Sequence, residues 1–314
     1  HDFGGLYPNP SVISAAIANA TDHIAIRAGS CVAPLHHPVR IAEEWAVVDN
    51  LSDGRVGVSF ASGWQPNDFV IQPESYENRK DIMFERIEQV DALWRGEALA
   101  FPDKDGGKTS VRTLPRPVQK ELPIWITAAG NPKTFRAAGA GGYHLLTHLL
   151  GQSVDELAEK IDTYRKARKE HGHDPDTGRV TLMLHTFVGE DEETVRDIVR
   201  EPMKDYLRSA VGLVKKAAWS FPAYKKKTTD EEGNFSLDHL SDEDMDEMLD
   251  FAFERYFETS GLFGTPDRCM ERVRELADVG VDELACLLDF GVEAQTVLDH
   301  LPALYEVRER AVEA

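Results

Sequence analysis

HIAIRAGSCVAPLHHPVR, residues 23–40, is the stretch of sequence that decides the fold class. It begins as a short strand with alternating apolar residues, passes through the small residues Gly29 and Ser30, and ends in a His-His-Pro turn that opens a helix. Small residues at the end of a strand let a flat ligand lie against the backbone. The same pattern recurs downstream, with small residues at the C-terminal ends of strands, where an α/β barrel builds its active site.

The rest of the chain alternates predicted strands with predicted helices. The strands are residues 23–29, 55–63, 123–130, 143–148, 180–189 and 283–291. The helices are residues 38–50, 77–94, 132–138, 154–171 and 265–279. Such alternation implies βα units around a parallel sheet. Because a closed barrel needs two more strands, we expect a (β/α)8 TIM barrel whose first two strands lie upstream of residue 1 and whose opening segment, HDFGGLYPNPSV, is a loop.

Two insertions interrupt this alternation. Residues 102–119 contain Gly-Gly and prolines, which predict a hairpin or an extended crossover. A longer insertion, from about 190 to 263, holds two helical stretches, and Ser241 begins the second because carboxylates in a first turn oppose the helix dipole. We interpret the acidic helix around residues 242–250 as a solvated surface helix rather than a partner-binding face. The predicted organisation is one barrel domain over residues 1–314, with the insertion before its last strand.

Composition restricts the partners and the compartment. The formal charge of −20 and a pI near 4.9 would repel nucleic acid and anionic lipid. No apolar run approaches the roughly 20 residues of a membrane span, so neither nucleic acid nor a membrane is an expected partner. Cys31, Cys269 and Cys286 show no CxxC spacing, which argues against a zinc site or a disulfide framework. We expect no metal and a reducing, cytoplasmic compartment.

The segment ITAAGNPKTF, residues 126–135, is a candidate anion site. A strand ends in Ala129 and Gly130, and Asn131 is a favoured N-cap for a helix that has proline in its first turn. Free backbone N–H groups at a helix N-terminus bind phosphate, and Thr134 adds a hydroxyl donor. An ordinary capped helix explains the same residues equally well.

Aromatic and histidine side chains follow other predicted strands. Ser62 and Gly63 end one strand, and Trp64 after them is either a pocket wall or, more often for one such residue, a packing residue. His36 lies in the loop after the first strand, and His148 lies near the end of another, where an imidazole suits proton transfer or ligand contact. A hydrogen-bonded structural histidine is the alternative for each. Metal-binding HEXXH, nucleophile-elbow, phosphate-loop and GxGxxG patterns are missing from the sequence, which argues against hydrolase, nucleoside triphosphatase and nicotinamide-domain functions.

Taken together, these segments resemble the bacterial luciferase-like flavin monooxygenase superfamily, and within it the branch associated with nonribosomal peptide and polyketide biosynthesis. The stretches that carry the resemblance are FGGLYPNPSV, RAGSCVAPLHHPVRIAEEWAVVDNLSDGRVGVSFASGW, RPVQKELPIWITAAGNPKTFRAAG, FERYFETSGLFGTPDRC and VDELACLLDFG. They occur in this order over essentially the whole chain. The resemblance implies an eight-stranded barrel that uses reduced FMN or a deazaflavin.

The resemblance also implies roles for individual residues. The cofactor-binding set comprises Gly29 and Ser30 at a strand bulge that often has a non-prolyl cis peptide, Ser62 and Gly63 beside the flavin, and Ala129, Gly130, Asn131 and Thr134 at the FMN phosphate. His1 matches the last residue of a Glu-Arg-His-Phe-His type motif and, with His148, is a candidate catalytic residue. His36 and Trp64 are candidates for the substrate pocket.

The implied function is a monooxygenase that uses reduced FMN, supplied by a separate flavin reductase, and O2. Its expected substrate is a small acyl or aminoacyl group on a carrier protein or another assembly-line domain. The obvious cluster of basic residues that could bind an acidic carrier protein comprises Lys215, Lys216 and residues 225–227. A homodimer is also compatible with the resemblance. Two alternatives are a deazaflavin-dependent dehydrogenase on the same barrel and a flavin-binding protein without turnover.

Overall fold

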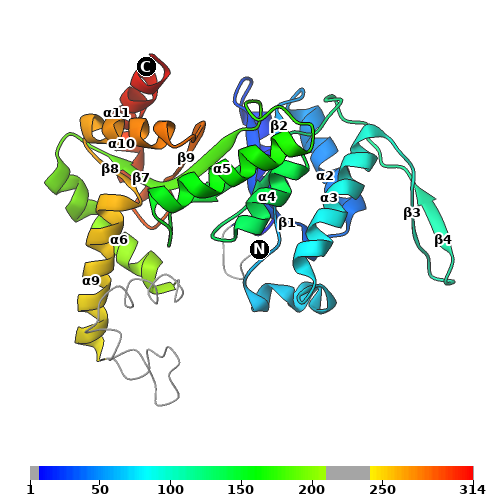
Figure 1. Ribbon diagram of the computed structural model, residues 1–314, viewed down its shortest axis with the longest axis horizontal. Helices are drawn as coiled ribbons and strands as arrows, with labels where there is room; N and C mark the ends of the chain where they lie inside the picture. The colour runs from blue at the N-terminus through cyan, green and yellow to red at the C-terminus, as the bar shows by residue number, and fades with distance from the viewer. Residues whose placement is uncertain (1–6, 210–240, 314) are drawn as a thin grey trace. The chain divides into compact units, whose positions relative to one another are not determined.

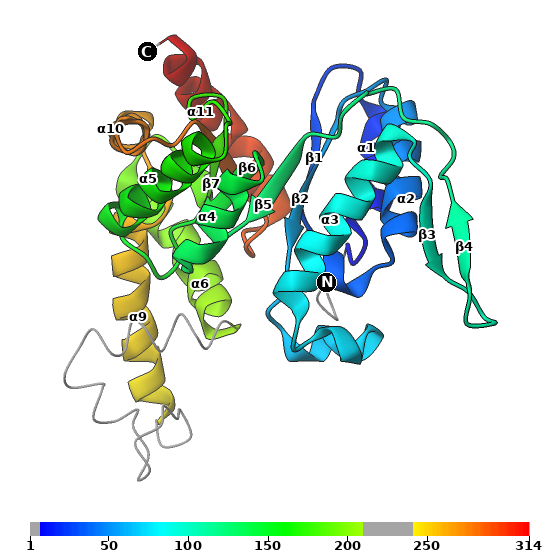
Figure 2. The same ribbon diagram turned by 45° about the vertical axis from the view of Figure 1, so that its right-hand side comes forward.

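The computed structural model describes residues 7–209 and 241–313 of the chain. The chain divides into two compact units, and each is described by itself. Unit 1 comprises residues 1–146 and 166–178, and unit 2 comprises residues 147–165 and 179–314. Figures 1 and 2 show the elements of both units along the chain. The prediction of one barrel domain over residues 1–314 stays a prediction.

Unit 1 is built on a parallel sheet in which β1, β2, β5 and β6 follow one another. The strands are β1 (Ile26–Val32), β2 (Val56–Ala61), β5 (Ile124–Thr127) and β6 (His144–His148), of which the last two residues belong to unit 2. Val58 lies opposite both Ala28 and Ile124, and all three side chains are buried. The four predicted strands of this region are therefore confirmed, although β1 begins and ends three residues later than expected.

Helices of unit 1 begin where the sequence supplies caps. They are α1 (Pro10–Ala20), α2 (Pro38–Leu51), α3 (Arg79–Arg95) and α4 (Pro132–Ala140), with 3-10 turns η1 (Ala33–Leu35), η2 (Pro66–Ile71) and η3 (Pro73–Ser75). The His-His-Pro turn opens α2 as predicted, because the His37 imidazole accepts a hydrogen bond from the Val39 N–H at 3.3 Å.

The opening segment, residues 1–12, was expected to be a loop; residues 1–6 lie outside the described residues, and the expectation is wrong for residues 10–12, which begin a helix. Asn9 caps α1 by accepting a hydrogen bond from the Ser11 N–H at 3.0 Å, and Pro10 occupies the first helical position. The helix PSVISAAIANA contains no charged residue, so it lacks the alternation of polar and apolar faces by which a surface helix is recognised. The Asn-Pro pair was the signal that could have found it.

The hairpin predicted within residues 102–119 is present, but it spans residues 99–111. β3 (Leu99–Pro102) and β4 (Lys108–Val111) pair antiparallel, and the hairpin projects from the rest of unit 1 (Figures 1 and 2). The chain that follows is fixed by Asp49, a fully buried residue of α2. One carboxylate oxygen accepts hydrogen bonds from the N–H groups of Val118 at 2.6 Å and Gln119 at 2.9 Å, and the other accepts from the Gln119 side chain at 2.7 Å.

Unit 2 is organised around β7 (Val180–Val188), which pairs in parallel with two strands. Its first half pairs with β9 (Glu283–Leu287), and its end pairs with the short β8 (Leu262–Gly264). The helices are α5 (Val154–Glu170), whose last residues belong to unit 1, α6 (Glu192–Ser209), α9 (Asp242–Thr259), α10 (Pro266–Asp278) and α11 (Ala294–Glu313). Sequence reasoning found β7 and β9 but missed β8, which has only three residues, and α11.

The acidic helix α9 lies at the surface, as interpreted for residues 242–250, because the side chains of Asp246 and Asp250 are 57% and 45% exposed. One face, including Met248, Phe253 and Phe257, is buried in an apolar core with α6 and β8. Acidic residues spaced by four along α9 pair with basic residues spaced by four along α6. The pairs are Lys204 with Asp246 at 2.7 Å and Asp250 at 3.0 Å, Arg200 with Glu254 at 2.9 Å, and Arg196 with Glu254 and with Glu258 at 2.7 Å. We call these pairs the α6–α9 ion-pair network.

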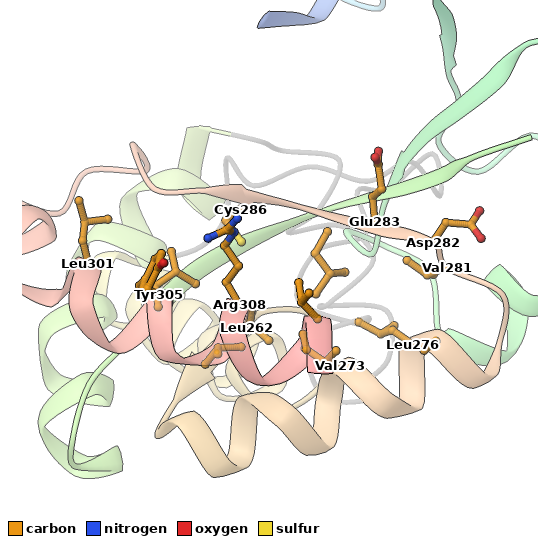
Figure 3. A pocket seen from close by; sticks show the side chains of 16 residues that line it. Leu262, Val273, Leu276, Val281, Asp282, Glu283, Cys286, Leu301, Tyr305 and Arg308 are labelled. Atoms are coloured by element: carbon orange, nitrogen blue, oxygen red, sulfur yellow. The ribbon is translucent and has the colours of Figure 1, made fainter. Parts of the chain in front are cut away.

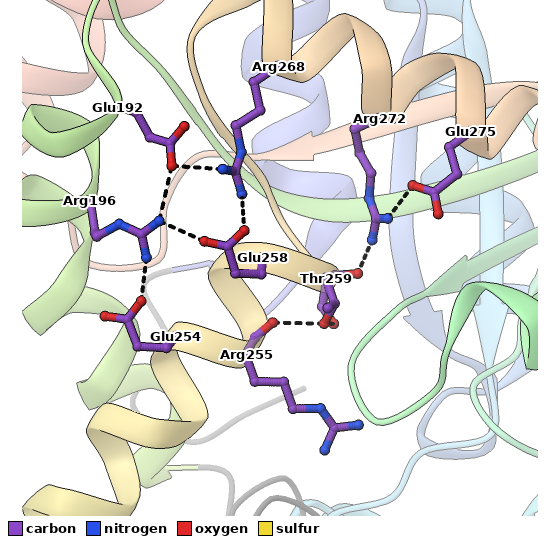
Figure 4. Close-up of polar contacts among 10 residues, drawn as sticks. Glu192, Arg196, Glu254, Arg255, Glu258, Thr259, Arg268, Arg272 and Glu275 are labelled. Atoms are coloured by element: carbon purple, nitrogen blue, oxygen red, sulfur yellow. Dashed lines mark hydrogen bonds and ion pairs between the residues drawn. The ribbon is translucent and has the colours of Figure 1, made fainter.

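Arg268 of α10 extends this network (Figure 4). Its guanidinium contacts Glu192 at 2.7 Å and Glu258 at 2.8 Å. The guanidinium of Arg196 lies 3.9 Å from the centre of the Phe257 ring, so the charges pack directly on the apolar core. The predicted helix start at Ser241 is confirmed, because its hydroxyl accepts a hydrogen bond from the Asp244 N–H at 3.1 Å.

Some predictions fall on residues that the structure does not describe. His1, Lys215, Lys216 and residues 225–227 lie outside the described residues. Within residues 7–209 and 241–313, no helix is long and apolar enough to cross a membrane, and no acidic, histidine or cysteine side chains gather as a metal site would require.

The three cysteines are free thiols. Burial raises the pKa of Cys31 to about 12, and the nearby Glu44 charge acts in the same direction. Burial also raises the pKa of Cys269 to about 12. These two thiols therefore stay protonated at neutral pH and are poor nucleophiles.

Candidate functional site

The C-terminal ends of β1, β2 and β5 lie side by side in unit 1. Pairing of β1 with β2 is regular at Ala28, opposite Val58, and resumes at Cys31, opposite Phe60. Gly29 and Ser30 therefore occupy the space of one partner residue, which is a β-bulge at the predicted position. The cis peptide bond that the resemblance implied here is not found, because the single cis bond among the described residues joins Leu114 to Pro115. The extra residue displaces the strand without one.

The glycines at these strand ends serve two different purposes. A Cβ atom on Gly29 would meet only the Leu146 side chain, at 3.9 Å, and one on Gly130 would meet nothing within 4 Å. Gly130 therefore borders open space, whereas a Cβ on Gly29 would make one ordinary van der Waals contact. Gly63 differs, because its φ of +78° and Cβ contacts of 2.9 Å with Phe69 and Val32 require glycine for the fold itself. Sequence reasoning assigned all three to ligand contact and could not separate packing from access.

The N-terminus of α4 has the geometry that the sequence predicted. Asn131 caps the helix, its side-chain oxygen accepting a hydrogen bond from the Lys133 N–H at 3.0 Å. Ala129, Gly130 and Asn131 are exposed, and Thr134 is half-buried. The Asn131 side chain thus occupies one helix-end donor, while the chain just before it remains open to a ligand. The ordinary capped helix is confirmed, and its use as a phosphate site stays a prediction.

A hydroxyl pair near these strand ends was missed by sequence reasoning. Ser59 of β2 and Thr127 of β5 are hydrogen-bonded through their side-chain oxygens at 2.7 Å. Ser59 lies opposite Trp125 in the register of the two strands. No local pattern marks such a pair, since it depends on the alignment of two strands whose hydroxyl residues are 68 positions apart.

Trp64 and His36 were predicted to contribute to a substrate pocket. The packing interpretation of Trp64 is wrong, because its side chain is 71% exposed, so the indole is accessible to a ligand. His36 is half-buried at the end of η1, and Arg86 donates a hydrogen bond to its carbonyl oxygen. Burial lowers the pKa of His36; Glu44 opposes this shift, and the positive charge of Arg86 adds to it.

Two histidines occupy strands of unit 2. His148 ends β6 and is half-buried, whereas His185 of β7 is buried to 1% exposure. The His185 ring meets the ring of Tyr206 at 4.4 Å and that of Phe290 at 5.4 Å, both edge to face. Burial, with a smaller effect of His148, lowers the pKa of His185 to about 4, so it is neutral at pH 7. Sequence reasoning did not find either ring as a neighbour of His185, because Tyr206 and Phe290 lie far from His185 in the sequence.

Unit 2 also contains a cavity of about 660 Å³ between β9, α10 and α11 (Figure 3). Its lining is mainly apolar and includes Leu276, Leu301 and Tyr305. None of the residues predicted to bind cofactor or substrate lines this cavity. The cavity is therefore not the predicted cofactor-binding or substrate-binding site.

Comparison with known proteins identifies the family. A family model described as luciferase-like monooxygenase matches residues 1–283. The chain belongs to the luciferase-like monooxygenase family. The expectation of this family is confirmed, whereas its natural-product branch stays a prediction.

Individual known proteins are similar to this chain in sequence or in fold. The oxygenase component of the flavin-dependent trigonelline monooxygenase of Acinetobacter baylyi is 26% identical over 294 residues, which is 91% of this chain and 75% of that protein. The oxygenating constituent of 3,6-diketocamphane monooxygenase from the CAM plasmid of Pseudomonas putida, solved in complex with FMN, has a TM-score of 0.70. That structure is 19% identical, with 96% of this chain and 82% of the other covered.

A related barrel with another cofactor has a similar fold. An F420-dependent secondary alcohol dehydrogenase, in complex with an F420-acetone adduct, gives a TM-score of 0.65 at 17% identity, covering 95% of this chain and 84% of that one. At these identities the two solved structures establish the fold. The predicted α/β barrel fold class of the luciferase-like type is confirmed.

Proposed function

We propose that this luciferase-like protein binds reduced FMN at the strand ends of unit 1 and uses it with O2 to oxygenate an organic substrate. The observation that carries the proposal is the β1 bulge at Gly29 and Ser30, next to strand ends that leave space at Gly130, in a chain of this monooxygenase family. Reduced FMN, when bound, supplies the electrons that activate O2.

The residues of unit 1 fit such a cofactor. The exposed backbone at Gly29 can accept a flat ring, because Gly29 itself has no side chain and the nearest atom to a Cβ there, of Leu146, lies 3.9 Å away. Exposed backbone at Ala129, Gly130 and Asn131 can approach an anionic group, which the positive end of the α4 dipole favours. Ser62 extends the same edge from β2.

The remaining predicted residues are assigned by their chemistry. The exposed Trp64 indole provides an apolar wall that excludes water from a bound substrate, and His36 contributes an imidazole whose pKa is lowered by burial. We assign the holding or moving of a proton to His148. His1 remains a candidate for the same task.

The resemblance to the natural-product branch supports a more specific substrate. We propose a small acyl or aminoacyl group presented by a carrier protein, with a separate reductase supplying the reduced flavin. The net charge of −20 requires a local basic surface for an acidic carrier protein. Association as a homodimer and a cytoplasmic site of action are further expectations of this proposal.

Cofactor titration followed by turnover tests the proposed function. Purified protein is titrated with FMN and with reduced FMN, and O2 uptake is followed with reduced FMN and carrier-bound acyl groups. We expect saturable binding of reduced FMN and a product heavier by one oxygen atom. Failure of both flavin forms to bind would overturn the proposal. Binding without substrate-dependent O2 uptake would favour the flavin-binding protein without turnover.

A deazaflavin-dependent dehydrogenase is the second candidate function. The similarity to the F420-dependent alcohol dehydrogenase fold favours it, although that similarity extends only to the fold. The two candidates differ in their need for O2, because hydride transfer to a deazaflavin requires none. Anaerobic turnover with F420 and no turnover with FMN would select the dehydrogenase.

A further inference from the structure

His185 combines deep burial with an unused polar atom. Its side chain is 1% exposed, and its Nε2 atom finds no hydrogen-bond partner in the part of the chain that the structure describes. A buried polar group that is left without a partner destabilises the folded state. A native protein that retains such a group needs a reason for it, and a ligand that completes the hydrogen bond is one.

The surroundings of His185 determine which ligand could do so. Phe290 is buried, whereas Tyr206 is half-buried, so Tyr206 covers the imidazole on the side nearer to solvent. Tyr206 is the less buried of the two rings, so it is the one that we expect to move for a ligand. Tyr206 lies in α6, and Phe290 follows β9, so the imidazole is enclosed by segments distant in the sequence.

Charge around His185 argues against an ionic ligand. Among the described residues, the aromatic neighbours of His185 carry no charge, and the titratable groups that act on His185 and on Tyr206 are His148 and Asp289, respectively. A carboxylate entering this environment would lose its hydration and meet the negative charge of Asp289. An uncharged carbonyl or hydroxyl oxygen could hydrogen-bond with a neutral imidazole, which offers one donor and one acceptor nitrogen.

We infer that His185 is a substrate-binding residue whose Nε2 hydrogen-bonds an uncharged oxygen of an apolar substrate after Tyr206 turns aside. The inference rests on the proposed function only in taking this ligand to be the substrate. A purely structural His185 makes the opposite prediction, since an apolar side chain would then fill the same aromatic enclosure at no loss of ligand binding.

The test observes the imidazole directly. The full chain is labelled with 15N-histidine, and the His185 ring resonances, assigned with His185→Gln, are followed by NMR at pH 7. The probes are decanal, acetophenone and benzyl alcohol, with decanoate and benzoate as charged counterparts. We expect at least one uncharged probe to shift the His185 resonances saturably, and the carboxylates to leave them unchanged.

Variants separate hydrogen bonding from packing. His185→Leu should weaken binding of the shifting probe at least about tenfold, as measured by calorimetry, which corresponds to about 1.4 kcal/mol. His185→Gln should retain part of the affinity, since an amide can also hydrogen-bond. His300→Gln is the matched control, because His300 also packs on an aromatic ring, that of Phe187 at 4.6 Å, and should leave the affinity unchanged.

Three results would overturn the inference: unchanged His185 resonances with every uncharged probe, equal affinity of His185→Leu and the original protein, or an equal response to carboxylates. Titration of FMN on the same samples keeps the proposed function distinct. If the original protein does not bind FMN, the cofactor proposal is refuted. The changes in the His185 resonances with the probes decide the role of His185.

Discussion

Small side chains added at Gly29 and Gly130 should separate the fold from cofactor binding. Neither glycine has a positive φ, and an added Cβ would meet Leu146 at 3.9 Å in one case and open space in the other. Gly29→Ala and Gly130→Ala should therefore keep the free energy of unfolding or raise it by about 0.4–1 kcal/mol, through a less flexible unfolded chain.

The same additions enter the space that we assign to FMN. Gly130→Val places three carbon atoms beside the backbone proposed to approach the phosphate, so the Kd for FMN should rise at least about tenfold, or about 1.4 kcal/mol. Gly63→Ala is the contrasting variant. Its Cβ would lie 2.9 Å from Phe69 and from Val32 at a φ of +78°, so it should destabilise the fold by about 1–3 kcal/mol.

Urea unfolding and fluorescence titration with FMN measure the two effects independently. We expect variants at Gly29 and Gly130 to be stable but to bind FMN poorly. Unchanged FMN affinity in Gly130→Val would refute the assignment of the phosphate to this segment. A loss of stability in Gly130→Ala would show that the space beside this glycine is not open.

Three further perturbations test individual contacts. The pKa of His185 is about 4 in the folded protein, whereas in the unfolded chain the imidazole binds a proton from about pH 6.5 downward. The free energy of unfolding should therefore fall by about 3 kcal/mol between pH 6.5 and 4. Urea titrations at each pH measure this slope, which His185→Phe should reduce. Arg196→Met should cost about 1–2 kcal/mol at low salt and less in 1 M NaCl, because Glu254 and Glu258 lose a shared cation; no salt dependence of the loss would contradict this. Asp49→Ala leaves two backbone donors without their acceptor and should cost about 3 kcal/mol by thermal unfolding, whereas a loss below about 1 kcal/mol would refute the anchoring role.

Local sequence signals predicted the elements that position the candidate site. Asn131 and Pro132 predicted the start of α4, and small residues predicted the ends of β1, β2 and β5. These features succeed because caps and chain turns depend on neighbours in the sequence. The α1 helix was not predicted, because it has no charged residue and so no polar face. Asn9 before Pro10 is nevertheless the same N-cap pattern that predicted α4.

Features that depend on distant segments could not be predicted. The acidic residues of α9 suggested a solvated face, and only their packing on α6 shows that Lys204 and Arg196 neutralise them. The spacing of four residues in both helices was visible, but the partner was not. The enclosure of His185 by Tyr206 and Phe290 likewise joins segments that no local pattern connects.

Hydrogen–deuterium exchange with and without FMN tests the central claim most directly. Binding of the flavin at the ends of the unit 1 strands predicts slower exchange of backbone amides in residues 28–32 and 128–134, in proportion to FMN occupancy. Saturated FMN binding with unchanged exchange in both segments would contradict the account.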